Sequence, residues 1–199
     1  MELTGRRMTW ICSYVLLQIL FISSYAASRS IVKTLPGFDG DLPFKLETGY
    51  IGVGEMDDVQ LFYYFVESQR KPSRDPLLVW LTGGPGCSSF KPFFYGIGPL
   101  SFDYISSERG LPTLHLNSDT WTKGLNILYI DAPVGSRFSY SKSLEGYHSP
   151  FGRPKNSSTS LYFSAKVVDR SPRISRKSSL PWWWFVYRHS YSSHSSKKI

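Results

Sequence analysis

"PLLVWLTGGPGCSS", residues 76–89, is the stretch that decides the fold. It joins a continuous apolar run directly to a Gly-Pro turn, a pattern typical of a strand buried on both faces of a sheet. The glycines leave consecutive backbone N–H groups unshielded by a Cβ, so the backbone can approach a ligand closely. Two converging N–H donors are what an oxyanion hole for acyl transfer requires. The motif therefore indicates either such a hole or a tight structural turn.

Three further stretches predict strands around this motif. They are "TGYIGVG" (48–54), "VQLFYYFVES" (59–68) and the apolar run that ends at Asp131 in "KGLNILYIDAPVGSRFSYS" (123–141). Each is rich in branched and aromatic residues and is followed by Gly, Pro or charge. No stretch before Pro150 has the period of a long amphipathic helix. The body is thus predicted to be β-rich and open, like the first half of a larger sheet.

The basic character of the chain belongs to its last quarter. Ten Lys and Arg residues and one acid, Asp169, follow Pro150, which gives that segment a charge of +9. The whole chain carries +8 and residues 1–26 carry +1, so residues 27–150 carry −2. Net charge is an argument about partners only where the charge lies, so it does not indicate a nucleic-acid partner. Beyond Pro150 serine dominates and neither apolar period holds, which is typical of disorder.

Residues 1–27 have the order of features expected of a secretory signal peptide. Arg6 and Arg7 precede an apolar run, and Ser24-Tyr25-Ala26 then places small residues at the positions that a signal peptidase reads. The run is shorter than the roughly 20 residues of a spanning helix, which is the alternative. Cleavage would remove Cys12 and leave Cys87 as the only cysteine. In an oxidising compartment, Cys87 is then either a buried apolar residue or one whose partner is missing.

Three separated stretches resemble the N-terminal part of plant serine carboxypeptidase-like proteins, peptidase family S10. They are "LPGFDGDLPFKLETGYIGV" (35–53), "FYYFVESQRKPSRDPLLVWLTGGPGCSS" (62–89) and "LNILYIDAPVGSRFSYS" (125–141). The resemblance covers residues 31–149, with the stretches in order. It implies an α/β-hydrolase fold with a Ser, Asp, His triad and an oxyanion loop after a strand.

The resemblance also implies roles for individual residues. Gly84 would be the oxyanion-hole donor, with Gly83 shaping the turn. Thr82 stands where the family's peptidases have an asparagine that binds the substrate's free carboxylate, which favours the branch that transfers acyl groups from glucose esters. Cys87 matches a cysteine that the family bridges to one far downstream. Arg137 replaces a glycine expected in "PVGSGFSYS", a change that puts a close backbone approach in doubt.

No G-x-S-x-G motif occurs in the 199 residues, and the triad is expected after residue 150. Ser88 and Ser89 are the nearest candidates, but the sequence arranges no acid and histidine to activate them. His115 and His148 are interpreted as ordinary surface or loop histidines. We therefore predict that this chain holds no catalytic residue and is inactive by itself.

The tail also decodes in another reading frame. Trp182, Trp183 and Trp184 have the single codon TGG, and the codon of Phe185 begins with T, so reading one base later gives Gly-Gly-Gly. Around this triplet the codons permit the string ENPLYxGGGSYTGI, which resembles the family's nucleophile elbow and the strand before it. The sequence therefore predicts a frame change near residues 148–150. The alternative is that the tryptophans form an aromatic membrane or ligand patch.

The sequence thus predicts three parts. Residues 1–27 are the signal peptide, 28–150 the N-terminal part of a serine carboxypeptidase-like domain, and 151–199 an aberrant basic, Ser-rich and disordered tail. The predicted fold class is α/β: the β-rich N-terminal part of an α/β-hydrolase fold, incomplete. Asn156, in Asn-Ser-Ser, is a candidate N-glycosylation site.

By resemblance, the full-length protein hydrolyses C-terminal peptide bonds through an acyl-serine intermediate. The alternatives are an acyltransferase that uses glucose esters and a non-catalytic secreted protein whose basic tail contacts anionic partners. The expected partner in the full-length family is a peptide or acyl-ester substrate, with no nucleic acid and no membrane after signal cleavage. No cofactor and no metal are expected. The expected location is extracellular or vacuolar, reached through the secretory pathway.

Overall fold

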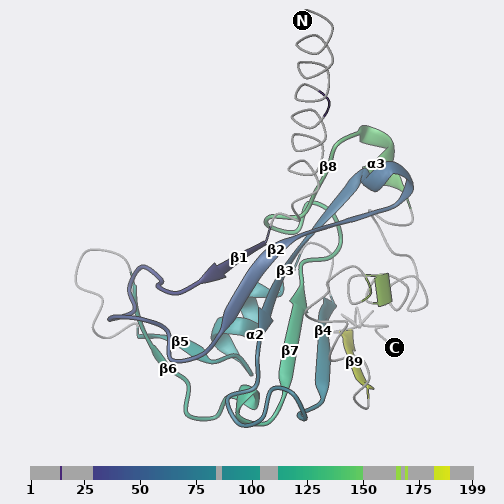
Figure 1. Cartoon of the computed structure of the whole chain (residues 1–199). Helices are drawn as coiled ribbons and strands as arrows, with labels where there is room; N and C mark the ends of the chain where they lie inside the picture. Colours follow the sequence, from purple (N-terminus) through teal and green to yellow (C-terminus); the bar gives the residue numbers. More distant parts are fainter. Residues whose placement is uncertain are drawn as a thin grey trace, which may run out of the picture.

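The structure is a computed structural model, and it describes residues 14, 29–83, 87–103, 112–149, 165–166, 169 and 182–188. Within them a mixed sheet runs in the order β1, β2, β3, β7, β4, β9, and β8 also pairs with β3 (Figure 1). The strands span Arg29–Val32 (β1), Leu46–Val53 (β2), Val59–Val66 (β3), Leu77–Gly83 (β4), Asn126–Ile130 (β7), Tyr140–Ser141 (β8) and Trp182–Arg188 (β9). Apart from Tyr14, the predicted signal peptide lies outside the described residues.

The predicted strands of the body are present. The run 77–81 is β4, and the run that precedes Asp131 is β7; the two pair in parallel from Leu77 opposite Asn126 to Leu81 opposite Ile130. All five residues of β7 are buried, as are four of the first five of β4. Parallel strands are normally covered on both faces, which is why both read as unbroken apolar runs. The prediction that the apolar run in "DPLLVWL" (75–81) forms a strand buried on both faces is confirmed for Leu77–Leu81.

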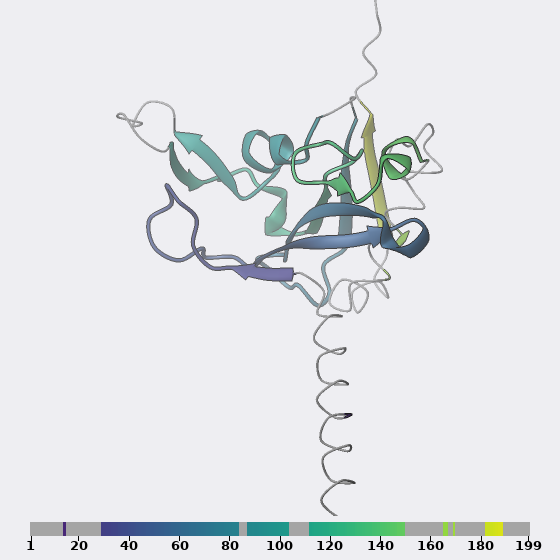
Figure 2. The ribbon, with the colours of Figure 1, turned by 90° about the horizontal axis from the view of Figure 1, so that it is seen from above.

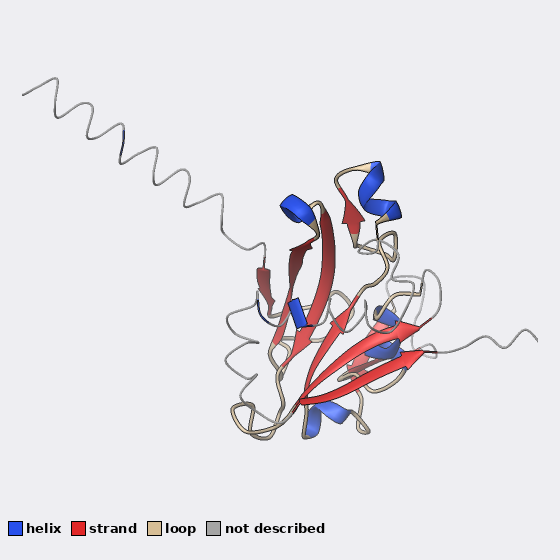
Figure 3. Ribbon diagram, turned by 90° about the vertical axis from the view of Figure 1, so that its right-hand side faces the viewer, coloured by secondary structure: helices blue, strands red, loops and turns tan. Residues whose placement is uncertain are grey.

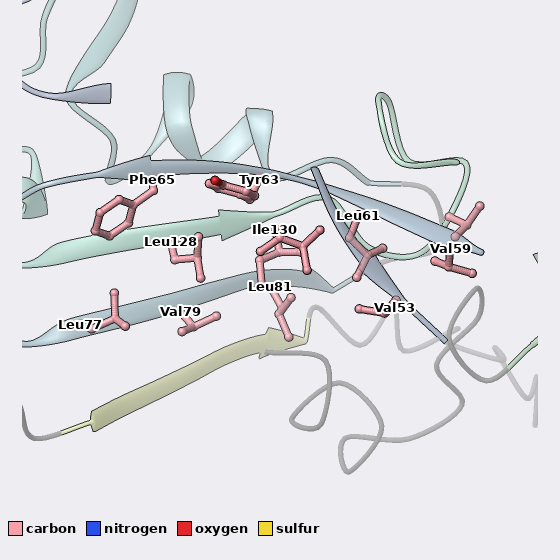
Figure 4. Close-up of a cluster of buried hydrophobic side chains, with 12 residues drawn as sticks. Val53, Val59, Leu61, Tyr63, Phe65, Leu77, Val79, Leu81, Leu128 and Ile130 are labelled. Carbon is pink, nitrogen blue, oxygen red and sulfur yellow. The ribbon is translucent and has the colours of Figure 1, made fainter. Parts of the chain in front are cut away.

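One face of the sheet carries a continuous apolar cluster. Figure 4 shows Leu77, Val79 and Leu81 of β4 lying along the same face as Leu128 and Ile130 of β7. The alternation of side chains along a strand places every second residue on this face. β3 adds Leu61, Tyr63 and Phe65 to the same cluster.

The opposite face packs against α2 (Phe90–Tyr95) and a two-stranded hairpin of β5 (Leu100–Asp103) and β6 (Thr113–Leu116). α2 lies beside this hairpin in two perpendicular views (Figures 1 and 2). Its buried Phe93 meets Tyr64 and Tyr129 at ring distances of 5.5 and 5.4 Å. The face that carries α2 is therefore built largely of aromatic rings, which supply large buried area.

The helices of the described body are short, as Figure 3 shows. Besides α2 they are α3 (Leu144–His148) and the 3-10 turns Glu55–Asp57 and Trp121–Lys123. The prediction of a β-rich body without a long amphipathic helix is confirmed over the described part of residues 29–149. The sequence had not indicated β1, β5, β6 or β8. No helix in the described ranges is long and apolar enough to span a membrane.

A polar network closes the sheet at the start of β4. Buried Asp75 accepts hydrogen bonds from the Ser68 hydroxyl at 2.5 Å and from the Lys71 N–H at 2.9 Å, and Arg70 pairs with it at 2.6 Å. The side-chain oxygen of Asn126 accepts from the Ser68 N–H at 3.0 Å. Hydrogen bonds from Arg70 are the main reason that the pKa of Asp75 is lowered. The network ties the loop before β4 to the start of β7.

β9 is the part of the tail that differs from the expectation of disorder. Residues 182–188 form a strand parallel to β4, with Trp182 opposite Leu77 and Arg188 opposite Gly83. Apart from residues 165, 166 and 169, the other tail residues lie outside the described part of the chain. The tryptophan triplet thus lies in an extended strand at the end of the described sheet order (Figure 1).

Candidate functional site

The candidate site lies at the carboxyl ends of the parallel strands β4 and β7, the edge at which open α/β sheets bind ligands. Thr82 and Gly83 are the last two residues of β4. Gly84, the expected oxyanion donor, lies outside the described residues, as do the side chain of Thr82 and residues 85 and 86. The chain is described again from Cys87, which leads into α2.

Asp131 connects this returning segment to the end of β7. Its Oδ1 atom accepts hydrogen bonds from the Ser88 hydroxyl at 2.6 Å and from the Ser89 N–H at 2.7 Å. The Ser89 hydroxyl donates to the carbonyl of Ile130 at 2.5 Å. The Ser88 hydroxyl also accepts from the Phe90 N–H at 3.0 Å. Both serines are therefore held by strand β7 at the start of α2.

The backbone of Asp131 is held as firmly as its side chain. Its N–H donates to the carbonyl of Phe62 on β3 at 2.9 Å, and its carbonyl accepts from the Ser139 hydroxyl at 2.6 Å. The same Ser139 hydroxyl accepts from the Phe62 N–H at 2.8 Å. Asp131 therefore joins β3, the turn after β7 and the segment before α2.

Asp131 is fully buried, and burial is the main reason that its pKa is raised. The hydrogen bonds from Ser88 and Ser89 and the nearby charge of Arg137 act in the opposite direction because they favour the carboxylate. Oδ2 has no hydrogen-bond partner, although the backbone of Phe138 lies near enough to lower the pKa. Both hydrogen bonds of good geometry to this carboxyl group are therefore accepted by Oδ1.

Tyr64 and Tyr50 interact electrostatically with the same group. Burial raises the pKa of Tyr64, and the charge of Asp131 raises it further. The Tyr64 hydroxyl makes no hydrogen bond of good geometry, although Ser88 lies near enough to lower its pKa. Tyr50 also has a raised pKa, first because of burial and then because of the charges of Tyr140 and Asp131. With raised pKa values, both tyrosines stay neutral near pH 7.

The turn after β7 explains why a glycine is expected at position 137. Arg137 has a φ of 49°, in the left-handed region that glycine adopts without strain. Its guanidinium carbon lies 4.1 Å from the centre of the Phe90 ring, a cation–π contact with the first residue of α2. The side chain that replaces glycine therefore lies outside the turn, against the helix that follows the candidate loop.

The structure places the candidate nucleophiles and histidines apart. His115 is exposed on β6, and His148 is exposed at the end of α3. The interpretation of both as surface residues is confirmed, although they lie in regular elements rather than loops. An acid does contact Ser88, because its hydroxyl donates to Asp131 Oδ1 at 2.6 Å. Because Ser88 also accepts from a backbone N–H, this contact fixes the segment and creates no serine–histidine–acid arrangement.

The structure describes Cys87 but not Asn156. The thiol of Cys87 is exposed and free, so it is not the buried apolar residue that the sequence left open. The pairing implied by the family remains a prediction. Asn156 lies outside the described residues. Among the described side chains, no group of three or more His, Cys, Asp or Glu could hold a metal.

The family model for serine carboxypeptidase matches residues 36–165, more than half of the chain. The chain belongs to the serine carboxypeptidase family. Its similarity to "Serine carboxypeptidase-like 14" of Arabidopsis thaliana is 49% identity over 83% of this chain and 36% of that protein. Its similarity to "Serine carboxypeptidase-like 16" of the same plant is 54% identity over 68% of this chain and 31% of that protein. The chain spans about a third of the length of these curated relatives.

Among solved structures, the chain is similar to Kex1(delta)p, a prohormone-processing carboxypeptidase from Saccharomyces cerevisiae. The match has 29% identity and a TM-score of 0.41, and covers 52% of this chain and 22% of that one. Membership of the serine carboxypeptidase family confirms the resemblance stated from three sequence stretches. The β-rich sheet with few helices agrees with the predicted class, the N-terminal part of an α/β-hydrolase fold.

Asp131 is the site residue that sequence reasoning missed. The sequence offers one signal for it: a lone acid directly after an unbroken apolar strand and before a Pro-Gly turn. A buried acid needs hydrogen-bond partners, so an acid at the end of a buried strand indicates that some segment reaches it. The signal does not name the segment, because Ser88 and Ser89 lie 43 and 42 residues earlier in the chain.

Proposed function

We propose that this chain is the oxyanion-loop part of a serine carboxypeptidase-like acyl-transfer protein, and that it has no nucleophile of its own. The observation that carries the proposal is that the described residues on both sides of the Gly-Gly-Pro-Gly motif are fixed. On one side is the end of β4 at Gly83, and on the other are the hydrogen bonds from Ser88 and Ser89 to Asp131. A loop held in this way suits backbone donors that must be in place before charge develops on a carbonyl oxygen.

The complete acyl-transfer reaction needs groups that these 199 residues do not supply. A serine hydroxyl must attack the carbonyl carbon while a base takes its proton, and the N–H groups of the loop stabilise the resulting oxyanion. No G-x-S-x-G motif is present, and the two described histidines are exposed, His115 opposite Ser101 in the β5–β6 hairpin and His148 at the end of α3. In this proposal the chain, secreted or vacuolar, retains the oxyanion donor at Gly84, with Gly83 shaping the turn, but turns over no substrate by itself.

In a full-length protein, the same loop would serve hydrolysis of C-terminal peptide bonds through an acyl-serine. Thr82 supports the alternative of acyl transfer from glucose esters, because a threonine cannot offer the amide N–H donors with which an asparagine binds a free carboxylate. The charge of +9 after Pro150 supports a third candidate, a non-catalytic secreted protein that binds anionic partners. If the tail carries this binding, a chain ending at residue 150 should no longer bind anionic partners. If such a shortened chain still binds them, the third candidate is wrong.

Covalent labelling tests the absence of a nucleophile. The purified full chain is treated with a fluorophosphonate probe and assayed with a blocked dipeptide and with a phenolic glucose ester plus an alcohol acceptor. A full-length serine carboxypeptidase of known activity is the positive control. We expect neither labelling nor inhibitor-sensitive turnover. Stoichiometric labelling of a serine in the chain would contradict this part of the proposal.

A chimaera tests the oxyanion loop itself. Residues 36–149 replace the matching segment of the active control enzyme, and we expect turnover to survive. Gly84→Pro in the chimaera removes the N–H donor and should lower kcat by about 10²–10³-fold, the usual effect of losing one oxyanion donor. Thr82→Asn should raise peptide hydrolysis relative to ester transfer. A folded chimaera whose turnover ignores Gly84→Pro would refute the assignment of the loop.

A further inference from the structure

Strand β4 has a different neighbour on each of its two edges. One edge pairs with β7 from Leu77 to Leu81, and the outer edge pairs in parallel with β9 along the whole length of β4 (Figure 4). β4 also contributes to both faces of the sheet: Leu77, Val79 and Leu81 lie in one apolar cluster, and Leu78 and Trp80 in the other. A strand on the outer edge of β4 therefore extends a sheet that is apolar on both faces.

The opposite end of the described sheet order is built differently. β1 has four residues, of which three are exposed; it begins with Arg29, and Lys33 follows it directly. Short and charged edge strands discourage pairing with another chain. β4 has seven residues and no charged side chain, so its outer edge has neither of these protections. The two ends of the sheet thus differ in their fitness to receive a further strand.

We propose that the outer edge of β4 is a binding site for extended peptides, and that β9 is its resident occupant. The peptide that fits is seven residues long, as β9 is, and pairs in parallel. It carries no charge along the strand and is apolar at successive positions, because both faces of the sheet are apolar there. Residues 182–187, Trp-Trp-Trp-Phe-Val-Tyr, have this composition. Main-chain hydrogen bonds supply affinity in such strand addition, and the side chains on both faces supply selectivity.

β9 competes with any such peptide because it belongs to the same chain. A tethered segment acts at an effective concentration that can reach about the millimolar range. A peptide from another protein, present at far lower concentration, therefore binds only after β9 has been released. The chain in this way blocks its own peptide site, and cleavage between α3 and β9 makes the site available.

A cut in the full chain tests the proposal. A protease recognition sequence is inserted after Ser178 in a Cys12→Ser background, and a dye is attached to the exposed thiol of Cys87. The chain is cleaved, the released segment is removed by dilution and gel filtration, and a synthetic peptide of residues 179–199 with a second dye is added. We expect the peptide to bind the cleaved chain at least about tenfold more tightly than the uncleaved chain.

The position of the second dye reports the direction of pairing. Arg188 lies opposite Gly83, four residues before Cys87, whereas Trp182 lies opposite Leu77 at the far end of β4. Because a strand rises about 3.3 Å per residue, the two ends of the bound peptide strand are about 20 Å apart. Energy transfer to the dye on Cys87 should be stronger from a dye beside Arg188 than from one beside Trp182.

Two variant peptides test the requirement for apolar residues on both faces. Each keeps one alternate set of apolar residues, which would suffice for an edge with a single apolar face. Both should bind at least about tenfold more weakly than the original peptide, because the buried apolar side chains of one face are lost. The first carries Trp183→Ser, Phe185→Ser and Tyr187→Ser, and the second carries Trp182→Ser, Trp184→Ser and Val186→Ser.

A proline variant opens the site without a cut, and it serves if the cleaved chain precipitates. Neighbouring residues of a strand direct their N–H groups to opposite edges, so Trp184→Pro with Phe185→Pro removes a ladder hydrogen bond to β4. The matched control, Tyr191→Pro with Ser192→Pro, lies beyond β9. The first pair should raise peptide binding to the uncleaved chain, and the second pair should leave it at the wild-type value.

The proposal is overturned if neither cleavage nor the proline pair in β9 increases peptide binding. It is equally overturned if energy transfer is stronger from the end at residue 182, or if either serine-substituted peptide binds as tightly as the original. These measurements report strand binding and not turnover. They are therefore independent of the oxyanion function proposed for the other end of β4.

Discussion

Replacing Arg137 by glycine and by alanine should separate the strain in the turn after β7 from the contact that its side chain makes. Arg137 has a φ of 49°, and an L-residue in the left-handed region costs about 1–2 kcal/mol. Its contact with the Phe90 ring, at 4.1 Å, is worth about 0.5–1 kcal/mol at an exposed site. Glycine relieves the strain but orders a more flexible backbone, at a cost of about 0.5–1 kcal/mol.

These terms predict an order of stability that side-chain size alone would not. Arg137→Gly gains the strain relief but loses the ring contact and orders a more flexible backbone, so its stability should lie within about 1 kcal/mol of wild type. Arg137→Ala keeps the strain and loses the contact, so it should be about 0.5–1 kcal/mol less stable. Gly135, at a φ of 83° in the same turn with open space around a built Cβ, provides the control. Gly135→Ala should destabilise the turn through strain alone.

Native-state hydrogen exchange of peptides covering residues 126–141 measures these differences locally. A difference of 0.5–1 kcal/mol corresponds to about two- to fivefold in exchange rate. Arg137→Ala should exchange faster than Arg137→Gly by that factor, and Gly135→Ala should exchange faster than wild type. If alanine at 137 protects the turn as well as glycine does, Arg137 is not strained, and the account of why a glycine is expected there fails.

The remaining predictions concern charge, packing and processing. Because the pKa of Asp75 is lowered, the ionised carboxyl group stabilises the fold above its ordinary pKa near 4, and this stabilisation is lost as the pH falls below that value. Asp75→Asn should remove this acid sensitivity, which hydrogen exchange measured from pH 7 to 3 would detect. Leu128 is fully buried in the apolar cluster, so Leu128→Ala should lower the free energy of unfolding by about 2–5 kcal/mol. Ile31 is half-exposed, so Ile31→Ala should lower it by under about 0.5 kcal/mol. Urea titrations monitored by hydrogen exchange measure both values. The secreted product should begin near Ala27 on N-terminal sequencing, and an intact Met1 would contradict a cleaved signal peptide.

The strands that could be predicted from the sequence are those whose apolar pattern is local. β2, β3, β4 and β7 are each a run of branched and aromatic residues closed by Gly, Pro or charge, so composition alone indicates them. β8 has two residues and β1 is mostly exposed, and both are defined by their partner strands rather than by their own pattern. Short strands of that kind depend on tertiary pairing, which sequence periodicity does not contain.

The residues of the candidate site also fall into those that a local motif indicates and those that depend on the strand order. The motif that contains Gly83 and Gly84 is local, because glycines after a buried strand suggest a backbone role wherever the strand lies; their predicted oxyanion role came from the family resemblance. Asp131 could not be assigned from the sequence, because its partners Ser88 and Ser89 lie on another segment and meet it only when β7 inserts between β3 and β4. A buried acid at a strand end predicts that partners exist, but only the strand order identifies them.

The tryptophan triplet requires two separate explanations, one for its origin and one for its conformation. Its codons decode one base over into three glycines, so the predicted frame change would explain why three tryptophans stand in a serine-rich tail. Its conformation follows from different physics: residues 182–188 are aromatic and branched, and the edge of β4 offers a row of unpaired backbone groups. Any segment of high β-propensity can pair there without having been selected for it. The parallel register of β9 with β4 is therefore compatible with a frame change and is not evidence for a selected function of the tail.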